Sequence, residues 1–420
     1  MCQPTKVRLA VWPFLVHPMP SSLFYYHSML RRTFLAATAI GTTRILGAND
    51  RIRVGVIGTG GRGTLLASEF KETGAEVAAV CDVYEPHLQN GLKAASTGAK
   101  GYDNYRRLLE DKSLNAVIVA TPDHWHAQMV IDAVDASKDV YVEKPMAHTI
   151  EDALRMVETV RHTDRIVQVG MQRRSSDLFM DARRIVQSGD IGEVHLVNSW
   201  WMNYAGDLRS PTLEGKLDWD QWLGPAPRRP LDPIRFRNWY WFYDYSGGMM
   251  VGQAAHIIDA INMLMNSSEP AAVTCAGGKI NVANAEIPET TSMAVEYPEN
   301  FLAVFTISYK AMRYNLHNDQ MKQFHGTKAR FDVGRESYAL YPQSNAIEIK
   351  PTVEVIKPGS FGPATRAHIR NFLECVRSRK QPNATVEMGL AASITLCMAV
   401  DSLRQGRRLV WDKTARRVKA

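Results

Sequence analysis

The stretch RIRVGVIGTGGRG, residues 51–63, decides the fold of the first half of the chain. Its β-branched residues predict a strand that runs directly into a glycine-rich turn, with Gly58, Gly60 and Gly63 in G-x-G-x-x-G spacing. The first glycine permits a tight turn, the second lets the backbone approach a pyrophosphate, and the third lets the next helix pack on the strand. The stretch predicts a dinucleotide-binding turn, and Arg62 within it is a further cofactor-binding candidate.

The residues that follow indicate which dinucleotide is bound. A helix is predicted over residues 61–74, and EVAAVCD, residues 76–82, forms a second strand that ends in Asp82, 22 residues beyond Gly60. A carboxylate at that place binds both ribose hydroxyls of the adenosine half and repels a 2′-phosphate. The spacing therefore favours NAD over NADP.

Two further strands complete the pattern of a parallel sheet. NAVIVATP, residues 115–122, ends at Thr121, and DVYVEKP, residues 139–145, ends in Glu143, Lys144 and Pro145. A helix over 125–137 separates them, a helix over 147–163 that Thr149 could cap follows, and IVQVG closes the domain at 170. Strands that alternate with helices predict a doubly wound parallel sheet over residues 49–170, with ligands beyond the carboxyl ends of its strands. The strand-end residues are therefore cofactor-binding candidates.

His124 and His126 open the helix after Thr121. They stand two residues apart, and neither an H-E-x-x-H pattern nor a cysteine partner accompanies them. We therefore predict no metal site and take His124 as a cofactor-binding candidate.

Composition narrows the class of protein. The chain has 420 residues, of which 45% are hydrophobic and 22% charged, as in a globular protein of two ordinary domains. Five basic residues and no acid among residues 1–48 leave only +2 of the net charge of +7 for the remainder. Without a basic stripe beyond the N-terminus we expect no nucleic-acid partner. The five scattered cysteines predict buried small side chains, not disulfides.

The N-terminal 48 residues have the order of an export signal. The twin arginine Arg31–Arg32 precedes Phe34, Leu35 and a short apolar run, which is typical of twin-arginine export, although a frayed basic helix is the alternative. Met29 is then a plausible true start. We expect the mature protein outside the cytoplasm if the N-terminal segment is an export signal, and in the cytoplasm if it is not. No later segment approaches the roughly 18 apolar residues of a membrane helix.

Residues 171–420 have a different pattern. The strand-like runs at 193–201, 272–280, 291–298 and 302–310 follow one another without a helix between each pair. They predict a second α/β domain with a large, mostly antiparallel, open sheet, one face of which is exposed or covered by a partner. Tryptophan and tyrosine cluster at 217–227 and 236–248, where they form either core or the stacking wall of a sugar pocket.

Seven motifs together resemble the Gfo/Idh/MocA oxidoreductases, and in particular their exported branch. They are the glycine turn, ATPDHWH at 120–126, EKP at 143–145, VQVGMQRRSS at 167–176, LDWDQWLGPAP at 217–227, GG with HxxD at 247–259, and HIRNFLECVRSRKQP at 368–382. The resemblance implies a Rossmann domain, a second domain whose open sheet mediates homo-oligomer contacts, C-terminal helices that pack on the Rossmann domain, and a nicotinamide cofactor acting on sugars, cyclitols or their glycosides.

The resemblance also implies the catalytic residues. Lys144 acts near the reacting hydroxyl and His256 accepts its proton, a role that suits an imidazole of ordinary pKa near 6.5. Asp259 lies three residues further along the same helix face and either contacts substrate, orients the ring or is a surface acid. Further candidates for contact with the substrate are Gln172, Arg173, Trp201 and Tyr243.

One position departs from the family pattern. Many of its dehydrogenases have an aspartate four residues before the histidine, where this chain has Gly252. Another acid replaces it in space, the substrate fills the vacancy, or the protein is not a simple dehydrogenase. Three functions therefore remain open: a sugar or cyclitol oxidoreductase, a redox-assisted glycoside-cleaving enzyme that keeps its NAD, and a non-catalytic NAD- and sugar-binding protein.

Overall fold

The structure is a computed structural model that describes residues 51–315 and 318–419. The predicted export signal over residues 1–48 and the alternative start at Met29 lie outside the described residues.

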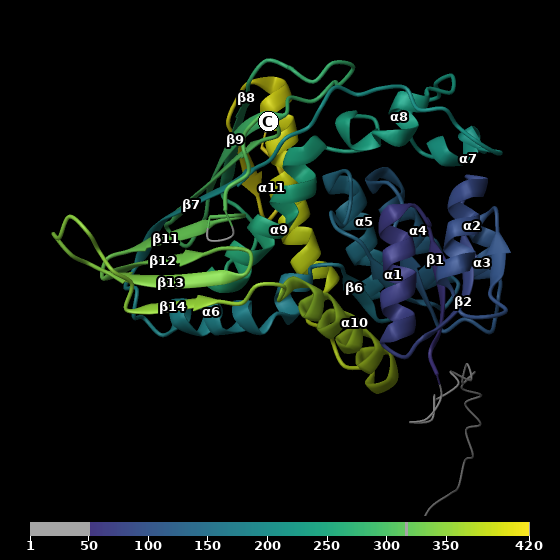
Figure 1. Ribbon diagram of the computed structural model, residues 1–420, viewed down its shortest axis with the longest axis horizontal. Coiled ribbons are helices and arrows are strands. Elements are labelled where there is room, and N and C mark those ends of the chain that lie inside the picture. The colour runs from purple at the N-terminus through teal and green to yellow at the C-terminus, as the bar shows by residue number, and fades with distance from the viewer. Residues whose placement is uncertain (1–50, 316–317, 420) are drawn as a thin grey trace, which may run out of the picture. The chain divides into compact units, whose positions relative to one another are not determined.

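The first half of the described chain forms a six-stranded parallel sheet in the order β3-β2-β1-β4-β5-β6, which confirms the doubly wound fold (Figure 1). The order reverses between β1 and β4, so their carboxyl ends diverge into a crevice where such sheets bind ligands. The strands are β1 Arg53–Ile57, β2 Glu76–Cys81, β3 Lys100–Tyr102, β4 Ala116–Val119, β5 Asp139–Val142 and β6 Val167–Val169.

Helices α1 Gly61–Glu72, α2 Glu85–Ala94, α3 Tyr105–Leu109, α4 Asp123–Asp135 and α5 Ile150–Arg161 connect these strands. α4 begins two residues before the predicted start, since Pro122 already holds the φ of −59° that suits a helix N-terminus. The Thr149 side chain accepts a hydrogen bond from the Asp152 amide at 3.1 Å, which confirms the predicted cap of α5.

A ten-stranded sheet in the order β14-β13-β12-β11-β7-β10-β9-β8-β15-β16 dominates the second half (Figure 1). Every neighbouring pair is antiparallel except β7 and β10, which confirms the predicted mostly antiparallel sheet. The strands are β7 Val194–Met202, β8 Ala272–Gly277, β9 Thr290–Glu296, β10 Leu302–Ser308, β11 Lys322–Gly326, β12 Ala329–Val333, β13 Ser337–Pro342, β14 Val353–Ile356, β15 Leu409–Asp412 and β16 Arg417–Val418.

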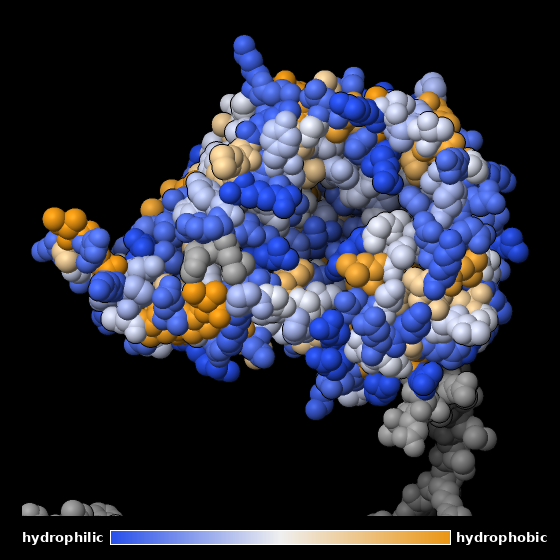
Figure 2. Space-filling model, in the orientation of Figure 1, coloured by the Kyte–Doolittle hydropathy of each residue, from blue (hydrophilic) through white to orange (hydrophobic). Residues whose placement is uncertain are grey.

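The helical elements of this half are η1 Gln172–Ser175, α6 Asp177–Gln187, α7 Trp219–Leu223, α8 Pro233–Arg237, η2 Trp239–Trp241, α9 Gly248–Met265, α10 Phe361–Ser378 and α11 Val386–Gln405. α6, α9 and α11 pack on one face of the large sheet. On the other face Ser292, Thr306 and Trp200 stand in register across β9, β10 and β7 and remain partly exposed. The loop between β13 and β14 ends in an apolar tip, where Ile347 is fully exposed (Figure 2).

α11 corrects one expectation from the sequence. Of the helices that the structure describes, it alone is long and apolar enough to cross a membrane, with a mean hydropathy of 1.5 over 18 residues. Its apolar surface has another explanation, because 67% of that window is buried and the helix packs against α5, α9 and β8. A helix buried among other elements is apolar on most of its faces.

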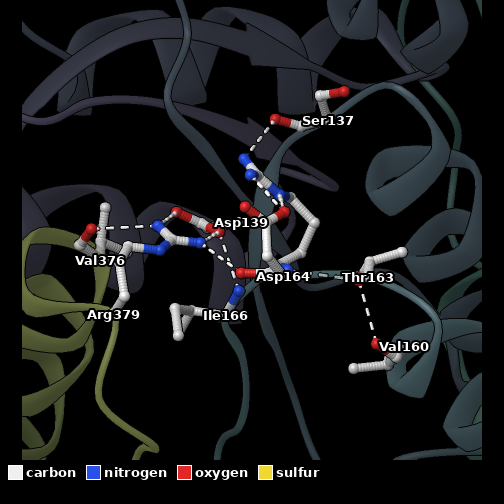
Figure 3. A network of polar contacts seen from close by, with 9 residues as sticks. Ser137, Asp139, Val160, Thr163, Asp164, Ile166, Val376 and Arg379 are labelled. Atoms are coloured by element: carbon white, nitrogen blue, oxygen red, sulfur yellow. Dashed lines mark hydrogen bonds and ion pairs between the residues drawn. The ribbon is translucent and has the colours of Figure 1, made fainter. Parts of the chain in front are cut away.

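C-terminal residues complete the core of the first sheet. Phe372 of α10 packs against Phe70 of α1 and Tyr141 of β5, with ring centroids 6.0 and 5.9 Å apart. At the end of α10 the Arg379 guanidinium donates two hydrogen bonds to the buried Asp139 carboxylate, at 2.7 and 2.8 Å, and a third to the Asp164 carbonyl (Figure 3). The C-terminal segment is therefore fixed to the first sheet by packing and by a charged pair.

The cysteines behave as predicted where they can be seen. Cys81, Cys275, Cys375 and Cys397 are buried, and none of these four forms a disulfide. Cys2 lies outside the described residues.

Candidate active site

A cavity of about 760 Å³ opens at the carboxyl ends of β1, β2, β4 and β5. Its volume is in the range of small-molecule and cofactor sites. Of the residues predicted from the sequence, it is lined by Gly58, Gly60, Arg62, Asp82, Thr121, Glu143, Lys144, Gln172 and His256. The fold thus brings strand-end residues of the first half together with a histidine from α9.

The glycine turn has the geometry that the motif predicts. Gly58 has a φ of +84°, and a Cβ there would lie 2.9 Å from the Ala120 backbone. A Cβ on Gly63 would lie 1.7 Å from the Gly58 carbonyl oxygen, so α1 can approach β1 only with glycine at that position. Beside Gly60 nothing but the His87 ring comes within 4 Å of such an atom. The backbone at Gly60 is therefore open to a pyrophosphate, as a dinucleotide requires.

Asp82 stands at the end of β2 on the cavity wall. Its carboxylate accepts hydrogen bonds from the Thr59 amide at 2.8 Å and the Tyr84 amide at 2.9 Å. These bonds fix the side chain beside the glycine turn, where the adenosine ribose of a dinucleotide lies in this fold.

The end of β5 carries Glu143 and Lys144. Glu143 accepts two hydrogen bonds from Arg62, at 2.9 and 2.6 Å. Although burial acts in the opposite direction, the Arg62 guanidinium lowers the pKa of Glu143. Lys144 points toward α9, where its Nζ donates to the Gly252 carbonyl oxygen at 2.8 Å. Burial lowers the pKa of Lys144, against the opposing effect of Glu143.

His256 lies one turn after Gly252 on α9 and contributes its ring to the cavity wall. Arg173 donates to its main-chain carbonyl at 3.0 Å, and Trp201 is nearly parallel to the imidazole, with centroids 6.3 Å apart. Burial and the positive charges of Lys144 and Arg173 lower the pKa of His256 well below 6.5. The imidazole is therefore neutral at pH 7, and it is a weaker base than an ordinary imidazole.

Seven predicted residues do not line the cavity: Gly63, His124, Pro145, Arg173, Trp201, Tyr243 and Asp259. Arg173 and Trp201 instead contact His256, as described above. Asp259 is buried and accepts a hydrogen bond from Arg174 at 2.7 Å, and the Tyr243 ring faces the Arg404 guanidinium at 4.9 Å. Both side chains thus have partners within the protein.

Neither histidine after β4 forms part of a metal cluster. His126 is buried between the carbonyls of Pro145 and Thr121, at 2.7 and 2.9 Å, and His124 faces the Trp222 carbonyl at 3.2 Å. Over residues 51–315 and 318–419, no group of three or more His, Cys, Asp or Glu side chains could hold a metal ion. His126 instead ties the end of β4 to the turn after β5.

A segment whose aromatic residues the sequence left open between core and the wall of a sugar pocket covers the nucleotide end of the cavity. Residues 213–241 cross from the second half over β2 and α3, where the Asp218 amide donates to the Val83 carbonyl at 2.9 Å and Asn104 donates to Gln221 at 2.9 Å. The segment and the residues beneath it add Asn104, Arg106, Asp220, Gln221, Trp222, Arg228, Phe236, Arg237 and Trp239 to the cavity lining. The aromatic density of 217–241 was the available signal, and it did not distinguish a cover from a core.

The fold combines a parallel Rossmann sheet, with a cavity at the carboxyl ends of its strands, and a large, mostly antiparallel sheet. Residues 52–171 match the family model described as "Oxidoreductase family, NAD-binding Rossmann fold", and residues 179–332 match that of the "GFO/IDH/MocA C-terminal domain". The chain belongs to the Gfo/Idh/MocA oxidoreductase family.

Among its curated relatives, the inositol 2-dehydrogenase of Salmonella typhimurium is 31% identical over 182 residues, which cover 41% of this chain and 54% of the relative. The chain thus matches about half the length of that relative. The myo-inositol 2-dehydrogenase of Thermotoga maritima is 28% identical over 363 residues, or 85% of this chain and 97% of the relative.

The fold is similar to that of a levoglucosan dehydrogenase solved in complex with NADH and levoglucosan. The TM-score is 0.68 at 15% identity, and the match covers 86% of this chain and 99% of the other. At that identity the likeness concerns the fold.

Proposed function

We propose that the protein is an NAD-dependent oxidoreductase that oxidises a hydroxyl-bearing carbon of a sugar, cyclitol or glycoside. The observation that carries the proposal is that Lys144 of the Rossmann half and His256 of α9 line one cavity with the glycine turn. The names of the relatives, inositol and levoglucosan dehydrogenases, support the class of substrate.

The residues present fit a dinucleotide. The Gly58 and Gly63 positions tolerate no Cβ, and Asp82 is fixed beside the turn. Gly58, Gly60 and Asp82 would hold the pyrophosphate and the adenosine ribose, and Glu143, Lys144 and Thr121 would border the nicotinamide end. NAD, when bound, supplies the nicotinamide that takes up the hydride. We expect NADP to bind less well, because the Asp82 carboxylate repels a 2′-phosphate.

The chain's own residues would move the proton. As the C–H hydride leaves the substrate carbon, the neutral His256 ring takes the hydroxyl proton, so that a carbonyl and an imidazolium form. Lys144 Nζ has donors free beyond its bond to Gly252 and can stabilise the negative charge that develops on the same oxygen. In the reverse direction His256 returns the proton.

A second candidate function is redox-assisted cleavage of a glycosidic bond by an enzyme that keeps its NAD. The segment 213–241 favours it, because it lies over the nucleotide end of the cavity and is bonded to Val83 and Asn104. A cofactor beneath such a cover exchanges slowly. An exported enzyme would benefit, since the cycle consumes no net NAD.

Purified protein separates these functions. Heat release tests for bound NAD, and a panel of sugars, cyclitols and glycosides is then screened for NADH and for cleaved products. Steady NADH formation supports the oxidoreductase, and cleavage without net NADH supports the second function. Ligand binding without turnover of any kind would refute both and leave a binding protein.

We also propose a homo-oligomer formed through the partly exposed face of the ten-stranded sheet, around Ser292 and Thr306, and a mature chain exported by its twin-arginine signal without a membrane span. The burial of α11 supports the last point. Light scattering of the purified protein tests the oligomer. Fractionation of cells that express the Arg31→Lys/Arg32→Lys variant tests the export. A monomer would refute the first, and unchanged export the second.

A further inference from the structure

Gly247, Gly248 and Gly252 lie near the start of α9, and the structural reason for a glycine differs among the three positions. Gly248 has a φ of +84°, and a Cβ on it would lie 2.5 Å from Ile287. A Cβ on Gly247 would lie 2.2 Å from Val251. Gly252 has no positive φ, and nothing stands within 4 Å of where its Cβ would be. Since glycine inside a helix costs about 1 kcal/mol relative to alanine, neither backbone geometry nor packing explains Gly252.

The space beside Gly252 lies next to the cavity wall that His256 and Lys144 form, although Gly252 is not itself a lining residue. Residues four apart lie on the same helix face, so a side chain at 252 would neighbour the His256 ring that lines the cavity. The Gly252 carbonyl accepts the hydrogen bond of Lys144 Nζ at 2.8 Å. Open space, a lysine and the candidate base therefore meet at one place.

The charges around this place do not balance. Within the part of the chain that the structure describes, Lys144 and the buried Arg173 and Lys322 have no carboxylate within the 4.0 Å of an ion pair. The nearby acids have other partners: Glu143 pairs with Arg62, Asp259 with Arg174, and Asp123 accepts from Ser246. Buried charges are normally paired, because an unpaired one loses its hydration without compensation.

The effect of this imbalance reaches His256. After burial, the largest effects on the pKa of His256 come from four cations, Lys144, Arg173, Arg62 and Lys322, which all lower it. The pKa of Arg173 is lowered to about 9, first by burial and then by Arg335. The cations nearest His256 at this end of the cavity, Lys144 and Arg173, therefore lack a carboxylate in direct contact, although the Asp123 carboxylate lies on the same cavity wall.

We propose that the substrate carries a carboxylate, as a sugar acid or other carboxylated polyol does, and that this group occupies the space beside Gly252 and pairs with Lys144. The inference rests on the proposed function and narrows its substrate class. The ligand supplies the negative charge that a side chain at position 252 would otherwise provide. Gly252 then determines specificity, since an acid in its place would exclude a carboxylated substrate.

The test compares matched substrates. Hexuronic acids are assayed beside their uronamides and the parent hexoses, with NADH formation as one readout and calorimetric binding to the NAD-loaded protein as the other. We expect kcat/KM to be about 100-fold higher for the acid than for its amide, because a buried charged pair is made only with the acid. Equal values for acid and amide would overturn the proposal.

Two variants refine the test. Gly252→Asp and the isosteric Gly252→Asn both have room, and thermal unfolding checks that both fold. We expect Gly252→Asp to abolish the preference for the acid and Gly252→Asn to retain part of it. If both variants lower activity on acid and amide equally, position 252 acts by size alone and the proposal fails. If the acid binds tightly but no compound is oxidised, the proposed function fails and the carboxylate site stands.

Discussion

The two ends of the cavity are built in different ways. The nucleotide end combines the backbone of residues 57–145, with its glycines and strand ends, and a cover from residues 213–241. At the substrate end, side chains meet from β5, η1, α9 and the start of α10. The first end depends on glycines, whose lack of a Cβ leaves the backbone accessible. The second end depends on side chains that only the complete fold brings together.

The largest expected effect is at the substrate end. His256→Ala removes the proposed proton acceptor, and we expect kcat to fall about 1000-fold while NAD affinity changes little. Steady-state kinetics measures kcat, and calorimetry measures the affinity for NAD. His195→Ala, an exposed histidine on β7, is the matched control and should retain full activity. Unchanged turnover in His256→Ala would refute its assignment as the base.

At the nucleotide end, adding a single methyl group should be enough to destabilise the fold. Gly63→Ala places a Cβ 1.7 Å from the Gly58 carbonyl oxygen, so we expect a loss of stability of at least about 3 kcal/mol and of NAD binding. Gly61→Ala, two residues earlier, meets no atom within 4 Å and should change stability by less than about 1 kcal/mol. Urea unfolding of both variants measures the two free energies of unfolding. Similar values would mean that α1 can move away from β1.

The next largest effect is expected at the ion pair between Arg379 and Asp139, which joins the C-terminal segment to the first sheet. Arg379→Met leaves the Asp139 carboxylate, only 2% exposed, without its cation, and we expect unfolding to become easier by about 2 kcal/mol. The estimate is below that of a fully buried pair because 40% of the Arg379 side chain is exposed. Arg377→Met, an exposed position on the same helix, is the control. An equal effect in both variants would show that the pair does not hold α10 on the sheet.

A smaller change is expected at Asp82. Asp82→Ala removes the ribose ligand but leaves the glycine turn, so NAD should bind about tenfold more weakly while NADP binding stays the same or improves. Calorimetry with both nucleotides measures the difference. If both weaken equally, Asp82 supports the Thr59 and Tyr84 amides and does not select the cofactor.

The same contrast explains how far the sequence could be interpreted. The first sheet and the cavity lining by the glycine turn and the strand ends were predictable because glycine spacing and strand ends are local properties of the chain. For Trp222, Phe236 and Trp239 the sequence left core and the wall of a sugar pocket open, because only tertiary contacts with Val83 and Asn104 bring their segment over the cavity. For Asp259 the helix face left a substrate contact, an orienting group or a surface acid open, and the sequence offered no sign that Arg174 would bind it.

The smallest expected change concerns pH, and it tests whether the substrate end is as positive as its side chains imply. A base with an ordinary imidazole pKa of 6.5 would lose about tenfold in kcat/KM between pH 7.5 and 5.5, as protonation removes its lone pair. Because burial, Lys144 and Arg173 lower the pKa of His256 well below 6.5, the ring stays neutral in that window, and we expect less than about a twofold loss.

Stability should change in the same window although activity does not. His256, His124 and His368 all have a lowered pKa in the folded protein, that of His124 about 3 and that of His368 about 4, because burial disfavours their charged forms. Below pH 6.5 the unfolded chain therefore binds more protons than the folded one, and each of the three histidines costs about 1.4 kcal/mol per pH unit until its own folded pKa is reached. Thermal unfolding at each pH separates this loss from catalysis. A tenfold loss of kcat/KM at pH 5.5 in protein that remains folded would mean that His256 titrates normally and that the cations around it are neutralised.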